Sequence, residues 1–320
     1  MTKALITGIN GQDGSYLTEH LLKENYEVAG LVRRSSVAEN QTFRINNLLN
    51  DIKTYYGDLT DADSLAHIVS DFKPDIVFNL AAQSHVRLSF SMPAYTAQVN
   101  AIGALNVFES IRKYCPNAKV YQASSSEMFG SSVDEDAYQR ETTPMTPVSP
   151  YGCSKLYAYS AARNYRKAYN LFISNGILFN HESPRRGTNF VTAKVVQGAL
   201  KIKSGKIKHL ELGNLDSYRD WGHSYDYTRA MLLLLKHNCP EDIVISSGEA
   251  RSVRDLCEVV FKKLDMDYKE YVKVNEKFIR PEELPYLRGD CRKGKKLLGW
   301  KPKYNFETLI EDMIDHISKN

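Results

Sequence analysis

Two short stretches of the sequence carry side chains that could transfer protons. Tyr151 and Lys155 are four residues apart, so on a helix beginning at Pro150 they share one face. There the Lys155 ammonium is expected to lower the pKa of the Tyr151 phenol, which makes Tyr151 a candidate base. Upstream, Ser125 and Glu127 add a hydroxyl and a carboxylate. Glu127 would add a second acid/base group, which simple alcohol oxidation would not need.

A glycine-rich stretch near the N-terminus predicts a dinucleotide site. Residues 7–14 read Thr-Gly-Ile-Asn-Gly-Gln-Asp-Gly, between a predicted strand and a predicted helix. The glycines permit a tight turn and a close approach of backbone to a pyrophosphate, and the helix N-terminus supplies N–H donors. The candidate cofactor contacts in this loop are Gly8, Asn10, Gly11, Gln12, Asp13 and Gly14.

The end of the second predicted strand bears on which nicotinamide cofactor would bind. An NAD site would place an acid there, whereas this chain has Arg33, Arg34, Ser35 and Ser36. Guanidinium groups and hydroxyls suit a 2′-phosphate, so the sequence favours NADP. Asp58, after the third predicted strand, could accept a hydrogen bond from the adenine amino group.

The elements that must position these residues follow an α/β pattern. Short β-branched runs alternate with amphipathic stretches, which is typical of a doubly wound parallel sheet. Strands are predicted at 3–7, 27–32, 53–56, 76–80, 120–124 and 172–178. Helices are predicted at 15–23, 61–72, 95–114 and 150–169. Ser125 and Glu127 then follow the fifth strand, at the sheet edge where such folds bind ligands.

Beyond about residue 180 the pattern is less regular. Residues 180–189 are expected to form a polar loop, followed by a helix to residue 204. Strands are predicted at 209–212 and 242–246, and helices at 252–264 and 306–317. A capping box from Ser252 to Asp255 begins the first of these two helices.

Length and composition fit a soluble enzyme. A chain of 320 residues can bury a large core, and a net charge of +4 suits anionic small molecules without excluding nucleic acid. We expect a cytoplasmic protein, because the opening residues Met-Thr-Lys-Ala-Leu-Ile-Thr show no basic region or cleavage site and no run approaches 18 uncharged apolar residues. Five scattered cysteines without ligand spacing predict no metal site.

The chain resembles the extended short-chain dehydrogenase/reductase superfamily and, more closely, the GDP-mannose 4,6-dehydratase family, over about residues 4–302. The motifs that carry the resemblance are Gly-Gln-Asp-Gly-Ser-Tyr-Leu at 11–17, Ala-Gln-Ser-His-Val at 82–86, Ser-Glu-Met-Phe-Gly at 126–130, Asn-His-Glu-Ser-Pro-Arg-Arg-Gly at 180–187 and Arg-Asp-Trp-Gly at 219–222. The resemblance implies a Rossmann NADP-binding domain over 1–178. A smaller, interleaved and mainly GDP-sugar-binding domain would cover 179–320, with about 222–248 returning to the first.

The resemblance also implies roles for individual residues. Catalysis would fall to Ser125, Glu127, Tyr151 and Lys155. Contacts to NADP would come from the glycine loop, from Arg33 to Ser36, and from Asp58, Leu59, Leu80, Ala81, Ala82, Gln83, Ser84, Tyr95, Tyr151, Lys155, His181 and Arg186. Contacts to the GDP-sugar would come from Ser84, Ser125, Glu127, Asn180, Lys194, Arg219, Arg280 and Glu283.

These roles imply an internal redox elimination on GDP-D-mannose. Tyr151 would take the O4 proton while the C4 hydride passes to NADP⁺, and the new ketone would acidify the C5 proton. Glu127 would remove that proton and protonate the departing C6 hydroxyl. Return of the hydride to C6 would give GDP-4-keto-6-deoxy-D-mannose with no net change of cofactor.

Two features depart from the family pattern. Ser125 stands where the family usually has threonine; the hydroxyl is kept and a methyl that fixes the rotamer is lost, so the chemistry is expected to survive. The segment over 33–56 is shorter than the family's, and it carries contacts between subunits in tetrameric relatives. A homodimer and a homotetramer both stay open.

Other functions stay open at this point. A GDP-manno-heptose 4,6-dehydratase would share the chemistry. A 4-reductase of GDP-4-keto-6-deoxy sugars, or an epimerase with a 4-keto intermediate, would need no base at C5, which Glu127 argues against. A non-catalytic NADP-binding protein would have no use for the four catalytic candidates. A mild positive charge alone supports neither nucleic-acid nor membrane binding.

Overall fold

The main sheet has the expected doubly wound order. The computed structural model describes residues 1–35, 42–279 and 281–319, so the candidates Ser36 and Arg280 lie outside the described residues. Within these ranges seven parallel strands run in the order β10-β6-β5-β4-β1-β2-β3. They are β1 Lys3–Thr7, β2 Glu27–Val32, β3 Lys53–Tyr56, β4 Ile76–Asn79, β5 Lys119–Ser125, β6 Ile173–Leu178 and β10 Asp242–Ile245. The chain order reverses between β1 and β4, and a crevice opens at such a point.

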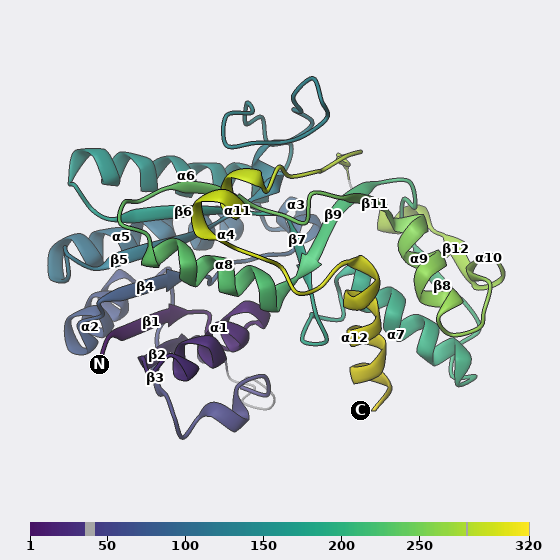
Figure 1. Cartoon of the computed structure of the whole chain (residues 1–320), viewed down its shortest axis with the longest axis horizontal. Helices are drawn as coiled ribbons and strands as arrows, with labels where there is room; N and C mark the ends of the chain where they lie inside the picture. The colour runs from purple at the N-terminus through teal and green to yellow at the C-terminus, as the bar shows by residue number, and fades with distance from the viewer. Residues whose placement is uncertain (36–41, 280, 320) are drawn as a thin grey trace.

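Helices cover both faces of this sheet (Figure 1). On one face α1 and α8 pack together, and Leu17, Leu21 and Met231 enter a buried core with the strands. On the other face α2, α5 and α6 form a layer around Phe72 and Phe108. These helices are α1 Gln12–Lys23, α2 Ala62–Phe72, α5 Gly103–Tyr114, α6 Pro150–Ala168 and α8 Ser224–Lys236. Burial on both faces explains the continuous apolar runs of the strands.

A smaller lobe lies beside the sheet lobe, with β9 between the two (Figure 1). Its helices pack around a separate core that includes Trp221 and Phe261. Its larger helices are α7 Val191–Lys203, α9 Val253–Lys262 and α12 Phe306–Ser318. Its short strands pair as β11-β9-β7 and β12-β8, with bounds β7 Asn180–Glu182, β8 Leu210–Leu212, β9 Tyr218–His223, β11 Ala250–Ser252 and β12 Val272–Val274.

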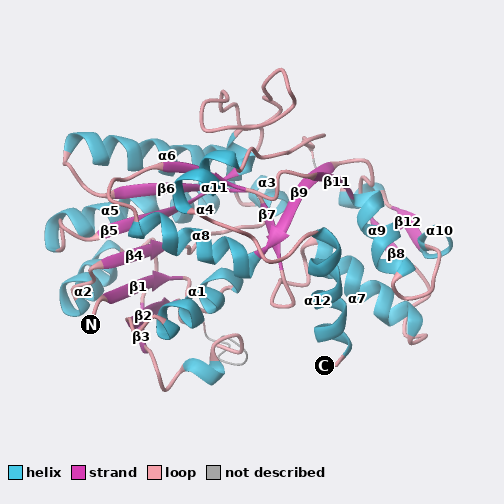
Figure 2. Cartoon of the chain, viewed as in Figure 1, coloured by secondary structure: helices cyan, strands magenta, loops and turns pink. Residues whose placement is uncertain are grey.

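Short elements complete the fold. The remaining α-helices of the described residues are α3 Val86–Ser91, α4 Pro93–Ala97, α10 Tyr268–Tyr271 and α11 Arg292–Leu298, and a tight turn at Ser126–Met128 follows β5. Figure 2 shows a long irregular segment between this turn and α6, over residues 130–149. No helix in the part of the chain that the structure describes is both long and apolar enough to cross a membrane.

The predicted fold class is confirmed, and the differences are local. The first three predicted strands match β1, β2 and β3 residue for residue, and the capping box at Ser252 is present. The helix predicted over 95–114 is instead α4, a π-helical turn at Gln98–Ile102, and α5. The buried Asn100 side chain on that turn bonds both to the backbone of Gln83 and to Ser154 Oγ.

The prediction of a polar loop over residues 180–189 is wrong at its start. There β7 pairs in parallel with β9, Asn180 opposite Trp221. A three-residue strand shows no readable alternation, and its partner lies about forty residues further along the chain. Tertiary pairing therefore decides this strand.

Candidate active site

A cleft of about 1220 Å³ opens over the carboxyl ends of the main-sheet strands and reaches the smaller lobe. Among the sequence candidates, those that line it are Gly8, Asn10, Gly11, Gln12, Asp13, Gly14, Arg33, Ser35, Asp58, Leu59, Leu80, Ala81, Ala82, Gln83, Ser84, Tyr95, Ser125, Glu127, Tyr151, Lys155, Asn180, His181, Arg186, Lys194, Arg219 and Glu283. Arg34 is absent from this lining; its guanidinium lies 5.2 Å from the centroid of the Tyr56 ring. The topology thus gathers residues from distant parts of the chain at one cavity.

Ser125, Glu127, Tyr151 and Lys155 form one wall of the cleft, which we call the proton-transfer wall. Ser125 ends β5, and its hydroxyl accepts a hydrogen bond from the Glu127 N–H at 3.2 Å. Tyr151 is held in the first turn of α6, where its N–H donates to Ser89 Oγ at 3.2 Å. A strand end and a helix start therefore present these side chains on rigid elements.

The first turn of α6 has a local cause in the sequence. Ser149 is the N-cap, and its Oγ accepts from the Gly152 N–H at 3.0 Å, while Pro150 occupies the first helical position. Lys155 follows Tyr151 by one helical turn. Its Nζ donates to the Ala123 carbonyl at 2.9 Å and lies 5.9 Å from the Tyr151 ring centroid.

The pKa of Tyr151 differs from the expectation drawn from the sequence. Burial raises the pKa of Tyr151 to about 12; a hydrogen bond to Ser125 lowers it and the charge of Glu127 raises it further. Burial also lowers the pKa of Lys155 to about 8. The Lys155 ammonium is engaged by a backbone carbonyl. With a pKa of about 12, Tyr151 is a protonated phenol at neutral pH when only the protein's own residues surround it.

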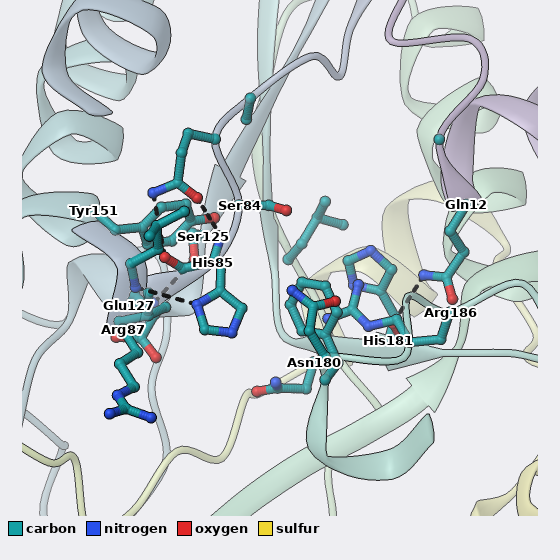
Figure 3. A pocket seen from close by; sticks show the side chains of 18 of the residues that line it. Gln12, Ser84, His85, Arg87, Ser125, Glu127, Tyr151, Asn180, His181 and Arg186 are labelled. Atoms are coloured by element: carbon teal, nitrogen blue, oxygen red, sulfur yellow. Dashed lines mark hydrogen bonds between the residues drawn. The ribbon is translucent and has the colours of Figure 1, made fainter. Parts of the chain in front are cut away.

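His181, Arg186, Lys194 and Arg219 form what we call the cationic wall. Figure 3 shows His181 and Arg186 on the far side of the pocket from Tyr151, Ser125 and Glu127. Each cation has an acidic or aromatic neighbour in the protein. Arg186 lies 2.9 Å from a Glu182 carboxylate oxygen, with its guanidinium 3.6 Å from the Phe190 ring centroid.

The cofactor end of the cleft is shaped for a closely approaching anion. Gly8 has a φ of +71°, and a Cβ on Gly14 would lie 2.4 Å from the Gly8 carbonyl oxygen. Gly11, the N-cap of α1, makes no side-chain cap, so the first N–H groups of α1 can serve a ligand. These residues fit a dinucleotide pyrophosphate.

The other end of the cleft is built from the smaller lobe. Arg219 Nη2 donates to Glu283 at 3.0 Å and Arg219 Nη1 to the Leu284 carbonyl at 2.9 Å. Lys194 Nζ donates to the Glu211 carbonyl at 2.6 Å and lies 3.7 Å from the Phe278 ring centroid. This end presents two anchored cations and an aromatic face.

Several lining residues were missed when roles were assigned from the sequence. His85 and Arg87 line the cleft, as do Phe278 and Phe190. His85 caps α3, its Nδ1 accepting from the Leu88 N–H at 3.2 Å. The motif at 82–86 already contained His85, whereas Phe278 lies in a stretch with no pattern to mark it.

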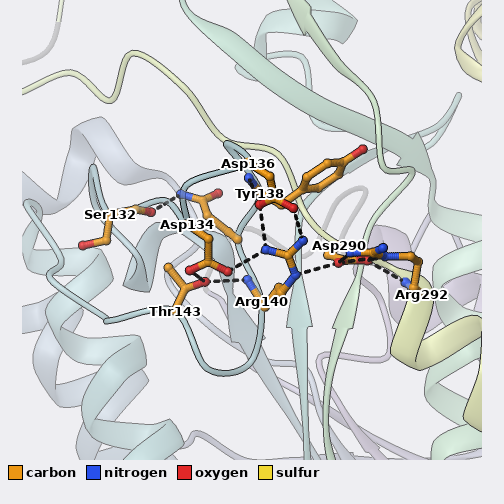
Figure 4. Close-up of polar contacts among 9 residues, drawn as sticks. Ser132, Asp134, Asp136, Tyr138, Arg140, Thr143, Asp290 and Arg292 are labelled. Atoms are coloured by element: carbon orange, nitrogen blue, oxygen red, sulfur yellow. Dashed lines mark hydrogen bonds and ion pairs between the residues drawn. The ribbon is translucent and has the colours of Figure 1, made fainter.

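An ionic network braces the loop over 130–149 that leads into α6 (Figure 4). Arg140 donates to Asp134 at 2.7 Å, to Asp136 at 2.8 Å and to Asp290 at 2.7 Å. Arg292 also donates to Asp290, at 2.5 Å. The network ties the loop to the C-terminal segment around Asp290.

A family model described as GDP-mannose 4,6 dehydratase matches residues 5–313 of this chain. The chain belongs to this family. Among curated members it is 49% identical to GDP-mannose 4,6 dehydratase 2 of Arabidopsis thaliana, over 98% of this chain and 86% of that protein. It is 46% identical to the Homo sapiens GDP-mannose 4,6 dehydratase, over 97% and 90%. The family resemblance read from the motifs is confirmed.

Solved structures place this GDP-mannose 4,6-dehydratase family member in the extended short-chain dehydrogenase/reductase fold. It is similar to UDP-glucose 4-epimerase of Thermotoga maritima, with a TM-score of 0.87, 26% identity and 99% coverage of both chains. It is also similar to dTDP-glucose 4,6-dehydratase of Bacillus anthracis, solved with NAD, with a TM-score of 0.85, 24% identity and coverage of 100% and 97%. The second likeness shows the fold alone.

Proposed function

We propose that this chain converts GDP-D-mannose to GDP-4-keto-6-deoxy-D-mannose with a retained NADP. The observation that carries the proposal is the convergence of Ser125, Glu127, Tyr151 and Lys155 on one cleft in a member of this family. The chain is 42% to 49% identical to curated relatives over nearly its whole length. Family membership supports the substrate, and the cleft supports the chemistry.

The proton-transfer wall can perform the proton steps of this reaction. Ser125 orients the O4 hydroxyl. The Tyr151–Lys155 pair loses one proton to give the Tyr151 phenolate beside the Lys155 ammonium, and this phenolate takes the O4 proton. Glu127 removes the C5 proton, made acidic by the C4 ketone, and gives a proton to the C6 hydroxyl as it leaves as water. Glu127, reprotonated from solvent, then gives a proton to C5, and Tyr151 releases the O4 proton to solvent, so the protons balance. A bound nicotinamide supplies the hydride acceptor for C4 and the hydride donor for C6.

The support for NADP lies at the end of β2, because the glycine loop fits the pyrophosphate of either NAD or NADP. This strand end carries Arg33, not an acid, and Arg33 Nη1 donates to the Tyr95 hydroxyl. Arg33, Ser35 and Tyr95 all line the cleft. Guanidinium recognises a phosphate monoester better than it does a bare ribose hydroxyl.

The smaller lobe supports binding of the GDP group. Phe190, the N-cap of α7, provides no side-chain cap, so the first N–H groups of α7 can receive a phosphate. Lys194 and Arg219 line the same end of the cleft. In this assignment residues 1–178 bind NADP and residues 179–320 mainly bind the GDP-sugar. The segment at about 222–248, which includes α8 and β10, returns to the sheet lobe.

The experiment that tests the function is mass spectrometry of the products after incubation with GDP-mannose and, separately, GDP-manno-heptose, with NADP⁺ added. We expect loss of one water from GDP-mannose and no accumulation of NADPH. Preference for the heptose would move the assignment to the heptose dehydratase. No product from either would contradict dehydration, and a 4-keto substrate with NADPH would then test the reductase.

Substitution of Arg33 tests the cofactor. Arg33→Ala should weaken NADP binding by about tenfold or more while NAD binding changes little, because only NADP offers a 2′-phosphate to the guanidinium. Titration of both cofactors against wild type and variant measures this, with Arg34→Ala as the matched control beside the cleft. Equal losses for both cofactors would contradict the assignment.

Size-exclusion chromatography with light scattering would decide between the proposed homodimer and homotetramer. Fractionation of the source cells would test the proposed cytoplasmic location.

A further inference from the structure

An acidic side chain in the pyrophosphate loop presents an electrostatic problem. Asp13 is the second residue of α1, directly beside the N–H groups that fit a pyrophosphate. A carboxylate exposed there would repel the anion that the helix N-terminus attracts. The structure shows how the chain resolves this conflict.

The Asp13 carboxylate is directed toward two other elements. Its Oδ2 lies 2.8 Å from His181 Nε2 in β7, and its Oδ1 accepts from the Ser224 hydroxyl in α8 at 2.6 Å. Gln12, the residue before it, adds two more bonds: Gln12 Nε2 donates to the His181 carbonyl at 3.1 Å, and Gln12 Oε1 accepts from Ser183 Oγ at 2.8 Å. The loop is therefore tied to β7 through adjacent side chains.

The surroundings of His181 require two N–H groups on its ring. Nδ1 lies 2.7 Å from the Phe179 carbonyl oxygen, which can only accept, and Nε2 faces the Asp13 carboxylate. A neutral imidazole has one N–H, so a ring between two acceptors is an imidazolium. The side chain is only 13% exposed. A partly buried cation thus stands against a partly buried carboxylate.

The neighbouring groups agree with this charge state. Burial by itself would lower the pKa of His181, but the charge and hydrogen bond of Asp13 outweigh it and raise that pKa. Burial would raise the pKa of Asp13, yet His181 and Ser224 lower it to about 2. The other groups facing the ring are Arg186, which opposes the positive charge, and Tyr227 of α8, whose ring stacks on it at 5.0 Å.

We propose that Asp13 is a positioning residue that holds His181 as a cation, and that this pair locks β7 onto the pyrophosphate loop so that the cofactor is retained. The pair removes the repulsion of the carboxylate and leaves His181 and Arg186 on the wall of the cleft. Retention matters here because both hydride transfers of one turnover use the same nicotinamide. The inference rests on the proposed function and differs from the direct cofactor contact that the sequence suggested for Asp13.

The test compares cofactor retention by Asp13→Asn and by wild type, in the absence of any sugar. Asparagine keeps the size and a hydrogen bond but loses the charge, and we expect NADPH to dissociate about tenfold faster or more. Stopped-flow displacement followed by NADPH fluorescence measures this rate. Ser224→Ala is the matched control, because it removes a neutral hydrogen-bond partner of Asp13 and leaves the charge pair; its dissociation rate should change less than about threefold.

A second measurement separates positioning from simple structural support. ¹⁵N NMR of labelled histidine in the wild-type protein should show both His181 nitrogens protonated at neutral pH, and His181 in Asp13→Asn should be neutral. The dissociation rate of wild type should rise as pH increases through the raised pKa of His181, and that rise should begin at lower pH in the variant. If Asp13→Asn does not fold, His181→Gln, which keeps one N–H toward Asp13, carries the same expectation.

The results distinguish the inference from the function beneath it. An unchanged dissociation rate, or a neutral His181 ring in the wild type, would overturn the role of Asp13 even if GDP-mannose is dehydrated. Retention that depends on Asp13 in a protein that dehydrates no GDP-sugar would overturn the proposed function and leave the role of Asp13 supported.

Discussion

The two walls of the cleft are assembled in different ways. The proton-transfer wall comes from a single stretch of about thirty residues, 125–155, and it rests on the end of β5 and the start of α6. The cationic wall comes from residues spread over 181–219, with Glu283 behind Arg219. Its shape depends on the pairing of β7 with β9 and on contacts between the two lobes.

Their electrostatics differ as well. The proton-transfer wall holds one carboxylate among hydroxyls and a lysine whose charge burial disfavours. On the cationic wall His181 pairs with Asp13, Arg186 with Glu182, and Arg219 with Glu283. The residues that transfer protons therefore stand on a strand end and a helix start, whereas these cations, which can bind an anion, are each paired with an acidic side chain. Substitutions in the first wall should therefore change kcat, and those in the second should change KM.

The largest effect is expected from Glu127→Gln in the proton-transfer wall. The amide cannot remove the C5 proton, so we expect kcat to fall by about 10²- to 10⁴-fold with KM nearly unchanged. Oxidation at C4 should persist and exchange of the C5 proton with solvent should stop, which NMR in D₂O measures. Glu135→Gln, at an exposed carboxylate, is the control. Near-normal turnover by Glu127→Gln would refute the role of the carboxylate.

Arg219→Met tests the cationic wall. Loss of the guanidinium removes a charge from the substrate end of the cleft and leaves Glu283 without this partner. We expect KM for GDP-mannose to rise by about 10- to 100-fold with kcat within a few-fold. Steady-state kinetics measure both constants, and Lys208→Met, an exposed lysine, is the matched control. A loss confined to kcat would remove the distinction between the two walls.

The pH dependence of the first hydride transfer sharpens the role of Tyr151 and Lys155. When the Tyr151–Lys155 pair loses its first proton, the proton can come from either residue. The Tyr151 phenolate with the Lys155 ammonium and the Tyr151 phenol with a neutral Lys155 hold the same number of protons, so both states appear at the same pH. The pKa of Lys155 is lowered to about 8 by burial. Below pH 8 the single-turnover rate should rise by about tenfold per pH unit, and above it the rate should level off.

The measurement is rapid mixing with GDP-mannose, followed by the absorbance of reduced nicotinamide between pH 6 and pH 10. Circular dichroism at each pH serves as the control for folding. A rate that does not change between pH 6 and pH 8 would mean that this pair does not supply the base.

The smallest effect on activity is expected from the network that braces the loop before α6. Asp290 is buried and accepts from both Arg140 and Arg292, so Asp290→Asn should lower the free energy of unfolding by about 1–3 kcal/mol. We expect kcat to change less than about twofold, because the network lies outside the cleft. Urea denaturation measures the stability. Asp265→Asn, at a side chain 95% exposed, is the control and should cost almost nothing.

If instead Asp290→Asn lowers kcat and leaves stability unchanged, the loop takes part in the chemistry. The ionic network around Arg140 would then belong with the proton-transfer wall, and Arg140 would count among the residues that position Tyr151.

Local interactions explain why much of the fold and one wall could be predicted. The strands β1 to β3, the N-cap at Ser149 and the capping box at Ser252 depend on residues within one turn or one strand of each other. Helical spacing also placed Tyr151 and Lys155 on one face. It did not give the pKa of Tyr151, because burial depends on residues packed from elsewhere in the chain.

The sequence by itself determined the doubly wound sheet, the glycine loop and the identity of the residues that can move protons, since each depends on short-range periodicity, steric freedom or side-chain chemistry. Only the tertiary structure decided that Asp13 faces His181, that β7 is a strand, and that Phe278 meets Lys194. Those partners are 168, about 40 and 84 residues apart in the chain. At such separations only tertiary packing brings the groups together, and the contact between Asp13 and His181 then sets their charges against the effect of burial.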